Sequence, residues 1–313
     1  MMPWIDPAMA PILERMRAAP VVDYPALSHK AGQDVFHTAA AFWNANPPAL
    51  ATVNNVDIPT PIGRMKGRLY ASATADLSAL VVHIHGGGWT FGSIDSHDQA
   101  SRLLALDTDM PVLAVDYRLA PANPSPAAIG DVNAAISFAL EGGLGQTVKP
   151  ARIVLAGDSA GANLALGALL VRRDSGLPTL AGAALFYGCY APLFETVSNK
   201  RFGDGSFGLS TARMRWYWAN HLGGRSDADP AAAPLNADLA GLPPLFLNAA
   251  GLDPLLDDSL LLAGRLAHCG VPTELDLVPG VVHGFMQMSR ELPAARGAFA
   301  RAAKALKTWL EEP

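Results

Sequence analysis

Residues 152–173 read RIVLAGDSAGANLALGALLVRR, and this stretch decides the fold prediction. Residues 152–156 are a predicted strand whose apolar run 153–156 is typical of burial on both faces of a sheet, and residues 161–173 have the pattern of a helix. Between them lies the chain's one Gly-x-Ser-x-Gly match, centred on Ser159. Glycines are needed at both ends of such a turn because strand and helix crowd together there. The turn exposes its serine hydroxyl at the top of the sheet, so Ser159 is the predicted nucleophile.

A second glycine-rich stretch, His-Gly-Gly-Gly-Trp at residues 85–89, directly follows the apolar run 80–84. Consecutive glycines let the backbone approach a substrate and turn its N–H groups toward a developing negative oxygen. We therefore expect the N–H groups of Gly87, Gly88 and Ala160 to form an oxyanion hole. His85 is expected to shape this loop by hydrogen bonding rather than to transfer a proton.

A catalytic serine needs a base, and in this arrangement the acid and then the histidine follow the serine along the chain. Beyond residue 221 the histidines are His268 and His283. His268 falls in the helical pattern 254–269 and reads as a surface residue. His283 lies in the loop expected after the strand 274–278. It is therefore the predicted base.

The acid that orients the histidine is predicted to be Asp253, which lies in the loop after the predicted strand 245–249. Asp257 and Asp258 lie one turn into the following helix, where carboxylates favour the N-terminal end. Asp276 falls inside a strand. The predicted catalytic residues are thus Ser159, Asp253 and His283.

Short apolar runs alternate with helical patterns from residue 53 onward. The predicted strands are 52–58, 67–71, 80–85, 112–117, 152–156, 183–187, 245–249 and 274–278, and the predicted helices between them are 97–106, 127–140, 161–173, 254–269 and 293–311. This alternation indicates βαβ units, hence an α/β fold with helices on both faces of a mostly parallel sheet.

Two segments interrupt the alternation. Residues 1–50 contain two predicted helices, at 8–17 and 27–42, and residues 190–235 contain an aromatic helix at 211–222. We interpret both as a cap over the carboxyl ends of the strands, where open α/β sheets bind ligands. The predicted division is N-terminal cap helices at 1–50, a catalytic core at 51–189 and 236–313, and a cap insertion at 190–235.

Composition excludes several classes of protein. Half of the 313 residues are hydrophobic and 16% are charged, which is typical of a globular chain with a large core. The net charge of −5 and the lack of a basic block argue against nucleic-acid binding. The N-terminus does not read as a signal peptide and no apolar run is long enough to span a membrane, so the predicted location is the cytoplasm. Cys189 and Cys269 are expected to be small buried hydrophobes.

In combination, these motifs resemble the hormone-sensitive lipase family of esterases, the microbial GDSAG branch of the α/β-hydrolase superfamily. The matching pieces are HGGGW at 85–89, DYRLAP at 116–121, GDSAG at 157–161, DPL at 253–255 and HGF at 283–285. The resemblance implies an eight-stranded, mostly parallel sheet with a helical cap, no cofactor or metal, and a small-molecule ester as substrate, and it allows a homodimer. Trp89, Trp216 and Phe285 are expected to line the substrate pocket.

The chain departs from that family at two positions. Where the family usually has Glu and often Phe, this chain has Ala122 and Ser125. The lost carboxylate is expected to alter a structural hydrogen bond, and the smaller side chains to loosen local packing. Both changes concern substrate range more than the catalytic residues.

The predicted function is that of a carboxylesterase for short-chain acyl esters that works through an acyl-enzyme. An amidase, lactonase or deacetylase with the same three residues stays open, because the triad serves any acyl group. A binding protein is the alternative outside enzymes, since fold alone does not fix function. Plant gibberellin receptors resemble this family but lack the catalytic histidine, whereas this chain has His283. An interfacial lipase is not favoured, because the cap has no long apolar segment.

Overall fold

The computed structural model describes residues 3–145, 148–225 and 229–311, and these form one eight-stranded sheet. The strands are β1 Thr52–Thr60, β2 Gly63–Ala71, β3 Ala79–Ile84, β4 Val112–Val115, β5 Arg152–Asp158, β6 Gly182–Phe186, β7 Leu245–Leu252 and β8 Thr273–Val282. Their spatial order is β1-β2-β4-β3-β5-β6-β7-β8. The β1–β2 and β2–β4 pairs are antiparallel and the others are parallel. The predicted mostly parallel, eight-stranded sheet is therefore confirmed.

The central strands are apolar throughout because both of their faces are covered. In β3, Leu80 and Val82 belong to one hydrophobic core and Val81 to the other. In β5, Leu155 and Val154 divide in the same way. Successive side chains of a strand point to opposite faces, so a strand buried on both sides needs an unbroken apolar run.

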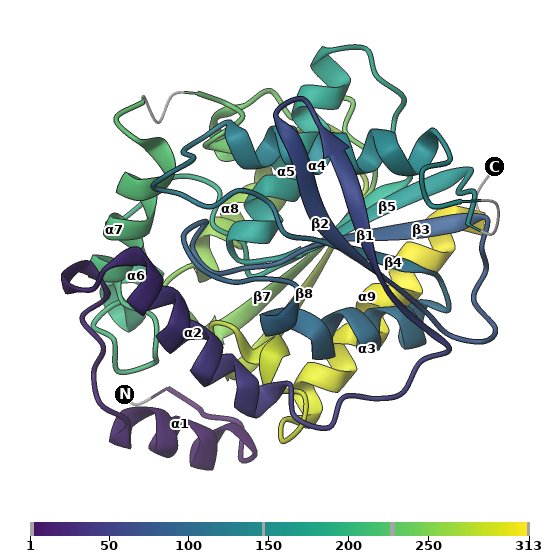
Figure 1. The fold of residues 1–313 in the computed structure, drawn as a ribbon. Coiled ribbons are helices and arrows are strands. Elements are labelled where there is room, and N and C mark those ends of the chain that lie inside the picture. The colour runs from purple at the N-terminus through teal and green to yellow at the C-terminus, as the bar shows by residue number, and fades with distance from the viewer. Residues whose placement is uncertain (1–2, 146–147, 226–228, 312–313) are drawn as a thin grey trace.

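Helices cover both faces of the sheet (Figure 1). On one face lie α4 Ala127–Leu140, α5 Ala160–Asp174 and α8 Leu256–His268, and on the other lie α3 Asp98–Thr108 and α9 Pro293–Glu311. Each of these helices was predicted, with ends that differ by one or two residues at most. The three-layer arrangement of the predicted α/β fold is thereby confirmed.

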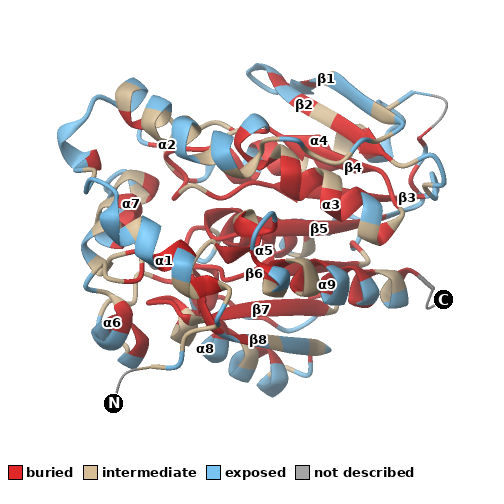
Figure 2. Ribbon diagram, turned by 90° about the horizontal axis from the view of Figure 1, so that it is seen from below, coloured by how far each residue is buried: buried red, intermediate tan, exposed pale blue. Residues whose placement is uncertain are grey.

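Four further helices gather at one end of the molecule, as Figures 1 and 2 show. They are α1 Met9–Ala18, α2 His29–Trp43, α6 Val197–Phe202 and α7 Thr211–Leu222. Three of them were predicted, whereas α6 was not. It has only 6 residues and begins where the Thr196 hydroxyl accepts a hydrogen bond from the N–H of Asn199, and so short a segment carries no periodic pattern.

Among the described residues, no helix combines the length and the hydrophobicity needed to cross a bilayer.

Candidate active site

Ser159 lies in a strained turn between β5 and α5. Its backbone has φ 54° and ψ −118°, a conformation that non-glycine residues rarely adopt outside functional turns. A Cβ on Gly157 would lie 2.4 Å from the carbonyl oxygen of Gly161, and one on Gly161 would lie 2.0 Å from that of Ile84. Both glycines are therefore required by close backbone approach, for the reason that the sequence suggested.

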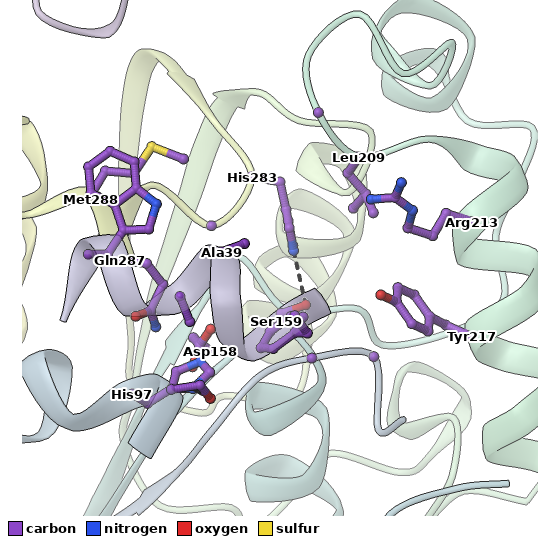
Figure 3. Close-up of a pocket in the computed structure, with 18 of the residues that line it drawn as sticks. Ala39, His97, Asp158, Ser159, Leu209, Arg213, Tyr217, His283, Gln287 and Met288 are labelled. Carbon is purple, nitrogen blue, oxygen red and sulfur yellow. Dashed lines mark hydrogen bonds and ion pairs between the residues drawn. The ribbon is translucent and has the colours of Figure 1, made fainter. Parts of the chain in front are cut away.

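Three predicted side chains meet in one hydrogen-bonded line, and Figure 3 shows its Ser159–His283 part. The Nε2 atom of His283 lies 3.0 Å from the Oγ atom of Ser159, and its Nδ1 atom lies 2.7 Å from the Oδ2 atom of Asp253. Each of the three directly follows the last residue of a strand: Ser159 follows β5, Asp253 follows β7 and His283 follows β8. Parallel neighbouring strands end at the same edge of the sheet, which is how residues far apart in the chain come together.

Asp253 is held in place from behind. Its side chain is fully buried, and its second oxygen, Oδ1, accepts a hydrogen bond of 2.8 Å from the N–H of Leu255. The pairing of β7 with β8 shifts register between Ala250 and Leu252, directly before this residue. The carboxylate therefore presents one oxygen to the backbone and the other to His283.

Asp257 and Asp258, the two acids that the sequence offered beside Asp253, both accept hydrogen bonds from backbone N–H groups elsewhere in the chain. Asp257 accepts a hydrogen bond from the N–H of Ser198, and Asp258 accepts one from the N–H of Tyr190. Asp258 is fully buried, and burial raises the pKa of its carboxyl to about 8. The expectation that both merely stabilise the start of α8 was incomplete, because both also fasten the segment that follows β6. His268, as expected, is exposed at the end of α8.

The glycine loop after β3 lies beside Ser159. Gly87 has φ 119° and its carbonyl accepts the N–H of Phe91, while Gly88 has φ 61°. A Cβ on Gly87 would lie 2.2 Å from the carbonyl oxygen of Phe91, and one on Gly88 would lie 2.3 Å from the ring of Tyr217. Ala160 is the first residue of α5, so its N–H has no partner inside the helix.

His85 stabilises this loop from below. Its Nδ1 atom lies 2.8 Å from the carbonyl oxygen of Gly86, and its ring stacks on Tyr117 at a centroid distance of 4.3 Å. Burial lowers the pKa of His85 to about 3, so the ring is neutral at ordinary pH. This geometry agrees with the expectation that His85 shapes the loop by hydrogen bonding and does not transfer a proton.

Asp158, the residue before Ser159, joins the glycine-flanked turn at 157–161 (the elbow) to the glycine loop. Its Oδ1 atom accepts a 3.0 Å hydrogen bond from the N–H of Gly86 and lies 3.5 Å from Nε2 of His97. Burial alone would raise the pKa of Asp158, but the charge of His97 and its hydrogen bond outweigh burial and lower the pKa to about 2. Sequence reasoning missed this pair, although the position of Asp158 inside the GDSAG motif was a signal.

A cavity of about 320 Å³ opens over Ser159 and His283. Its walls come from the sheet edge and from the helices α1, α2 and α7, with Met16, Phe36, Trp43, Leu209, Arg213, Met214, Tyr217 and Met288 among the lining residues. The size is within the range of small-molecule sites. No group of three or more His, Cys, Asp or Glu side chains in the described part of the chain is arranged to hold a metal ion.

The three aromatic residues expected in the pocket lie elsewhere. Trp89 is 1% exposed, donates its indole N–H to Asn163, and stacks on His221 of α7. Phe285 is fully buried against Tyr187, and Trp216 packs on Phe91. None of the three lines the cavity. Neighbours in α7 do so instead, because the helix turns its Arg213–Met214–Tyr217 side toward Ser159.

Comparison with known proteins agrees with this geometry. A family model described as the alpha/beta hydrolase fold matches residues 81–287. The chain belongs to the α/β-hydrolase family. The match covers the glycine loop, the elbow, the acid and the histidine, and the resemblance to the hormone-sensitive lipase family is confirmed.

Solved α/β hydrolases resemble this one over its whole length. An ester-hydrolase from the metagenome of Lake Arreo, complexed with a derivative of bipyridine phosphonate, is 31% identical with a TM-score of 0.91, covering 99% of this chain and 100% of that chain. An esterase from Pyrobaculum calidifontis is 29% identical with a TM-score of 0.90, at 99% and 100% coverage. A thermostable esterase from Pseudomonas putida is 26% identical with a TM-score of 0.91, covering 100% of both chains.

The two departures from the usual family motif lie away from the cavity. Ala122 is exposed, and the nearby Arg118 is paired instead with Asp131, whose carboxylate accepts from the guanidinium and from the Arg118 N–H. Ser125 is buried; its N–H donates to the carbonyl of His221, and its hydroxyl has no partner among the described residues. The motif's arginine therefore has its carboxylate partner without Glu at 122.

Proposed function

We propose that this α/β hydrolase is a carboxylesterase that hydrolyses short-chain acyl esters through an acyl-enzyme on Ser159. The observation that carries the proposal is the line Ser159–His283–Asp253, with distances of 3.0 and 2.7 Å, beside a small cavity. The likeness to whole-length esterases supports the same reaction class.

His283 acts as the general base. Asp253 accepts a hydrogen bond from the Nδ1–H group of His283, which leaves the Nε2 lone pair directed at the Ser159 hydroxyl. As Oγ attacks the ester carbonyl, its proton passes to Nε2, and the imidazolium that forms is stabilised by the buried carboxylate. The same proton then goes to the departing alcohol. Water repeats the sequence on the acyl-enzyme and releases the carboxylic acid.

The N–H groups of Gly87, Gly88 and Ala160 form the oxyanion hole in this proposal. Gly87 and Gly88 have positive φ angles and line the cavity together with Ser159, and Ala160 begins a helix whose N-terminal end favours negative charge. Donors fixed in advance cost no reorganisation when the tetrahedral oxygen becomes negative. Each such donor typically contributes about 3 kcal/mol to lowering the barrier.

The helices α1, α2, α6 and α7 form the cap in this proposal, so residues 1–50 and 190–235 are cap and the rest is core. Three of these helices contribute lining residues to the cavity, and its volume of about 320 Å³ suits a small acyl group better than a long one. The cytoplasmic location and the homodimer that the sequence allows stay predictions.

Replacing Ser159 with Ala tests the proposal directly. The variant is expected to keep its fold, judged by thermal unfolding, and to lose hydrolysis of p-nitrophenyl butyrate by roughly 10⁴-fold or more. Ser175→Ala, an exposed serine at the end of the same helix, is the matched control and should retain activity. Undiminished turnover by Ser159→Ala would remove the assignment.

A matched ester and anilide separate an esterase from an amidase with the same triad. For p-nitrophenyl butyrate and its p-nitroanilide counterpart, we expect a far higher kcat/KM for the ester, because an amide's leaving nitrogen needs stronger protonation in the transition state. Equal values for the two substrates would favour the amidase.

A further inference from the structure

Arg213 brings a positive charge to the cavity wall on the cap side. It lies in the first turn of α7, where its backbone N–H donates to the hydroxyl of Ser210 at 3.1 Å, and its side chain lines the same cavity as Ser159. Figure 3 shows the guanidinium directed from α7 into this space, beside Leu209 and Tyr217. The cavity wall around it is otherwise largely apolar.

This guanidinium is fixed without a counter-charge. Its Cζ atom lies 4.9 Å from the centre of the Tyr24 ring, a distance that permits a cation–π contact. Within residues 3–145, 148–225 and 229–311, no carboxylate forms an ion pair with it. A half-buried charge facing apolar surface is stabilised when a ligand supplies the missing anion.

Arg215, two residues along the same helix, shows what a paired arginine looks like here. Its guanidinium lies 3.2 Å from a carboxylate oxygen of Glu195 and 4.3 Å from the ring centre of Phe194. It is exposed and does not line the cavity over Ser159. The two arginines of α7 thus differ in their surroundings, one paired on the outside and one unpaired on the inside.

The negative charge in the same cavity is already engaged. Asp158 accepts from the N–H of Gly86 and lies 3.5 Å from Nε2 of His97, on the opposite side of Ser159 from Arg213 in Figure 3. The cavity therefore has a hydrogen-bonded carboxylate, Asp158, at one wall and a guanidinium without a carboxylate partner, Arg213, at the other. An anionic group on a substrate is drawn to the Arg213 wall and away from Asp158.

We propose that Arg213 determines substrate specificity by binding a carboxylate that the ester carries away from its scissile bond. The planar guanidinium can donate two parallel hydrogen bonds to a carboxylate, so it favours this anion in geometry as well as in charge. The substrate class is then half-esters of dicarboxylic acids or acyl esters of hydroxy acids. This inference rests on the proposed esterase function and adds the chemical class of its substrate.

Substrate pairs that differ in one charge test the inference. The acyl-side arm uses monoethyl glutarate, adipate and pimelate, each beside the neutral primary amide of the same length. The alcohol-side arm uses 4-(butyryloxy)butanoate beside its amide. We expect the wild-type protein to favour the charged member in kcat/KM by about tenfold or more in one arm, mainly through KM, because a hydrogen-bonded ion pair contributes that much.

Variants of the two arginines assign the preference to one position. Arg213→Gln should lower the charged-to-neutral ratio by about tenfold or more, and Arg213→Lys should restore part of it. Arg215→Gln is the matched control and should leave the ratio within about twofold of wild type. Equal kcat/KM for charged and neutral wild-type substrates in both arms would overturn the inference without needing any variant. An equal loss in Arg215→Gln would overturn it as well.

Calorimetry with the Ser159→Ala protein keeps this inference separate from the proposed function. The half-ester of the favoured length should bind this protein, and Arg213→Gln on the same background should weaken binding by about tenfold or more. Binding that depends on Arg213 without turnover of any ester by wild type would overturn the esterase function alone. Hydrolysis of the neutral esters without Arg213-dependent binding would overturn the present inference alone.

Discussion

Gly87 illustrates how one residue without a side chain supports the whole site. A Cβ at this position would come within 2.2 Å of a backbone oxygen, that of Phe91, and the φ of 119° is unfavourable for any other residue. A backbone atom cannot rotate away as a side chain can. The substitution must therefore displace the loop that carries the proposed oxyanion donors.

We predict that Gly87→Ala lowers kcat for p-nitrophenyl butyrate by about 100-fold or more, since the loop shift misplaces the proposed donors. Gly130→Ala is the control, because Gly130 lies in α4 with open space around its Cβ position and an ordinary φ. That variant should keep full activity and gain up to about 1 kcal/mol of unfolding free energy, measured by urea denaturation. Full activity in Gly87→Ala would contradict the loop's proposed part.

Sequence reasoning reached the residues that backbone geometry dictates. Ser159 was found because a glycine-flanked turn between a strand and a helix has few other uses, and His283 because the chain offers few histidines late in the sequence. Arg213 and His97 were missed. Arg213 lies on α7 and His97 directly before α3, and where their side chains point depends on how α7 and α3 pack in the folded molecule, which local spacing does not encode.

Among the helices and loops around Ser159, Asn163 of α5 contacts three segments of the chain through its side chain. Its side-chain amide donates to the carbonyl oxygens of Cys189 and Ala232 at 3.0 and 3.1 Å, and its oxygen accepts the indole N–H of Trp89. Asn163 lies in α5 and is fully buried. Asn163 thus fastens α5 to the glycine loop, to the chain around Cys189 and to the chain around Ala232.

Asn163→Leu should lower the unfolding free energy by about 3 kcal/mol, because it leaves the Cys189 carbonyl and the Trp89 indole N–H buried without these partners and removes one donor to the Ala232 carbonyl. Denaturation in urea measures the change. Asn54→Leu, the same substitution at an exposed site in the edge strand β1, should change stability by less than about 0.5 kcal/mol. Similar stability for Asn163→Leu and wild type would show that the network carries little energy.

The strand and helix patterns predicted the layers well because they report burial, which the fold enforces along whole elements. The same patterns predicted the ends of the strands less accurately. The strand predicted at 152–156 continues to Asp158, and the one predicted at 274–278 continues to Val282, directly before His283. The added residues of β5 are Gly157 and the polar Asp158, and those of β8 begin with Pro279 and Gly280, which ordinarily mark a turn, so neither continuation has a strand-like pattern.

For the molecule as a whole, one buried acid couples stability to pH. Asp258 is fully buried, with one oxygen lacking any partner among the described residues, and burial raises the pKa of its carboxyl to about 8. In the unfolded chain the ordinary pKa of Asp is about 4. Between about pH 4 and 8 the folded protein therefore holds a proton that the unfolded chain has released. The stability linked to this proton is fully present below about pH 4 and is lost as the pH rises toward 8.

Asp258→Asn should flatten this dependence, because the amide keeps an acceptor for the N–H of Tyr190 and has no proton to lose. Between pH 5 and 8, we expect the variant to gain on wild type in unfolding free energy by up to about 1.4 kcal/mol per pH unit. Urea denaturation at several pH values measures both slopes. Glu274→Gln, at an exposed position of β8, should leave the wild-type slope unchanged. Parallel curves for Asp258→Asn and wild type would contradict the prediction.

The proposed chemistry of the whole molecule depends on Ser159 being activated by His283, and covalent labelling measures this most directly. Diethyl p-nitrophenyl phosphate reacts with an activated serine by forming an O–P bond and releasing p-nitrophenolate, while the base takes the hydroxyl proton. The tryptic peptide 153–172 contains one serine, Ser159, so mass spectrometry assigns the site without ambiguity. We predict one phosphoryl group on this peptide, and labelling at least about 100-fold slower in His283→Ala. A label on another peptide, or an unchanged rate in His283→Ala, would contradict the account.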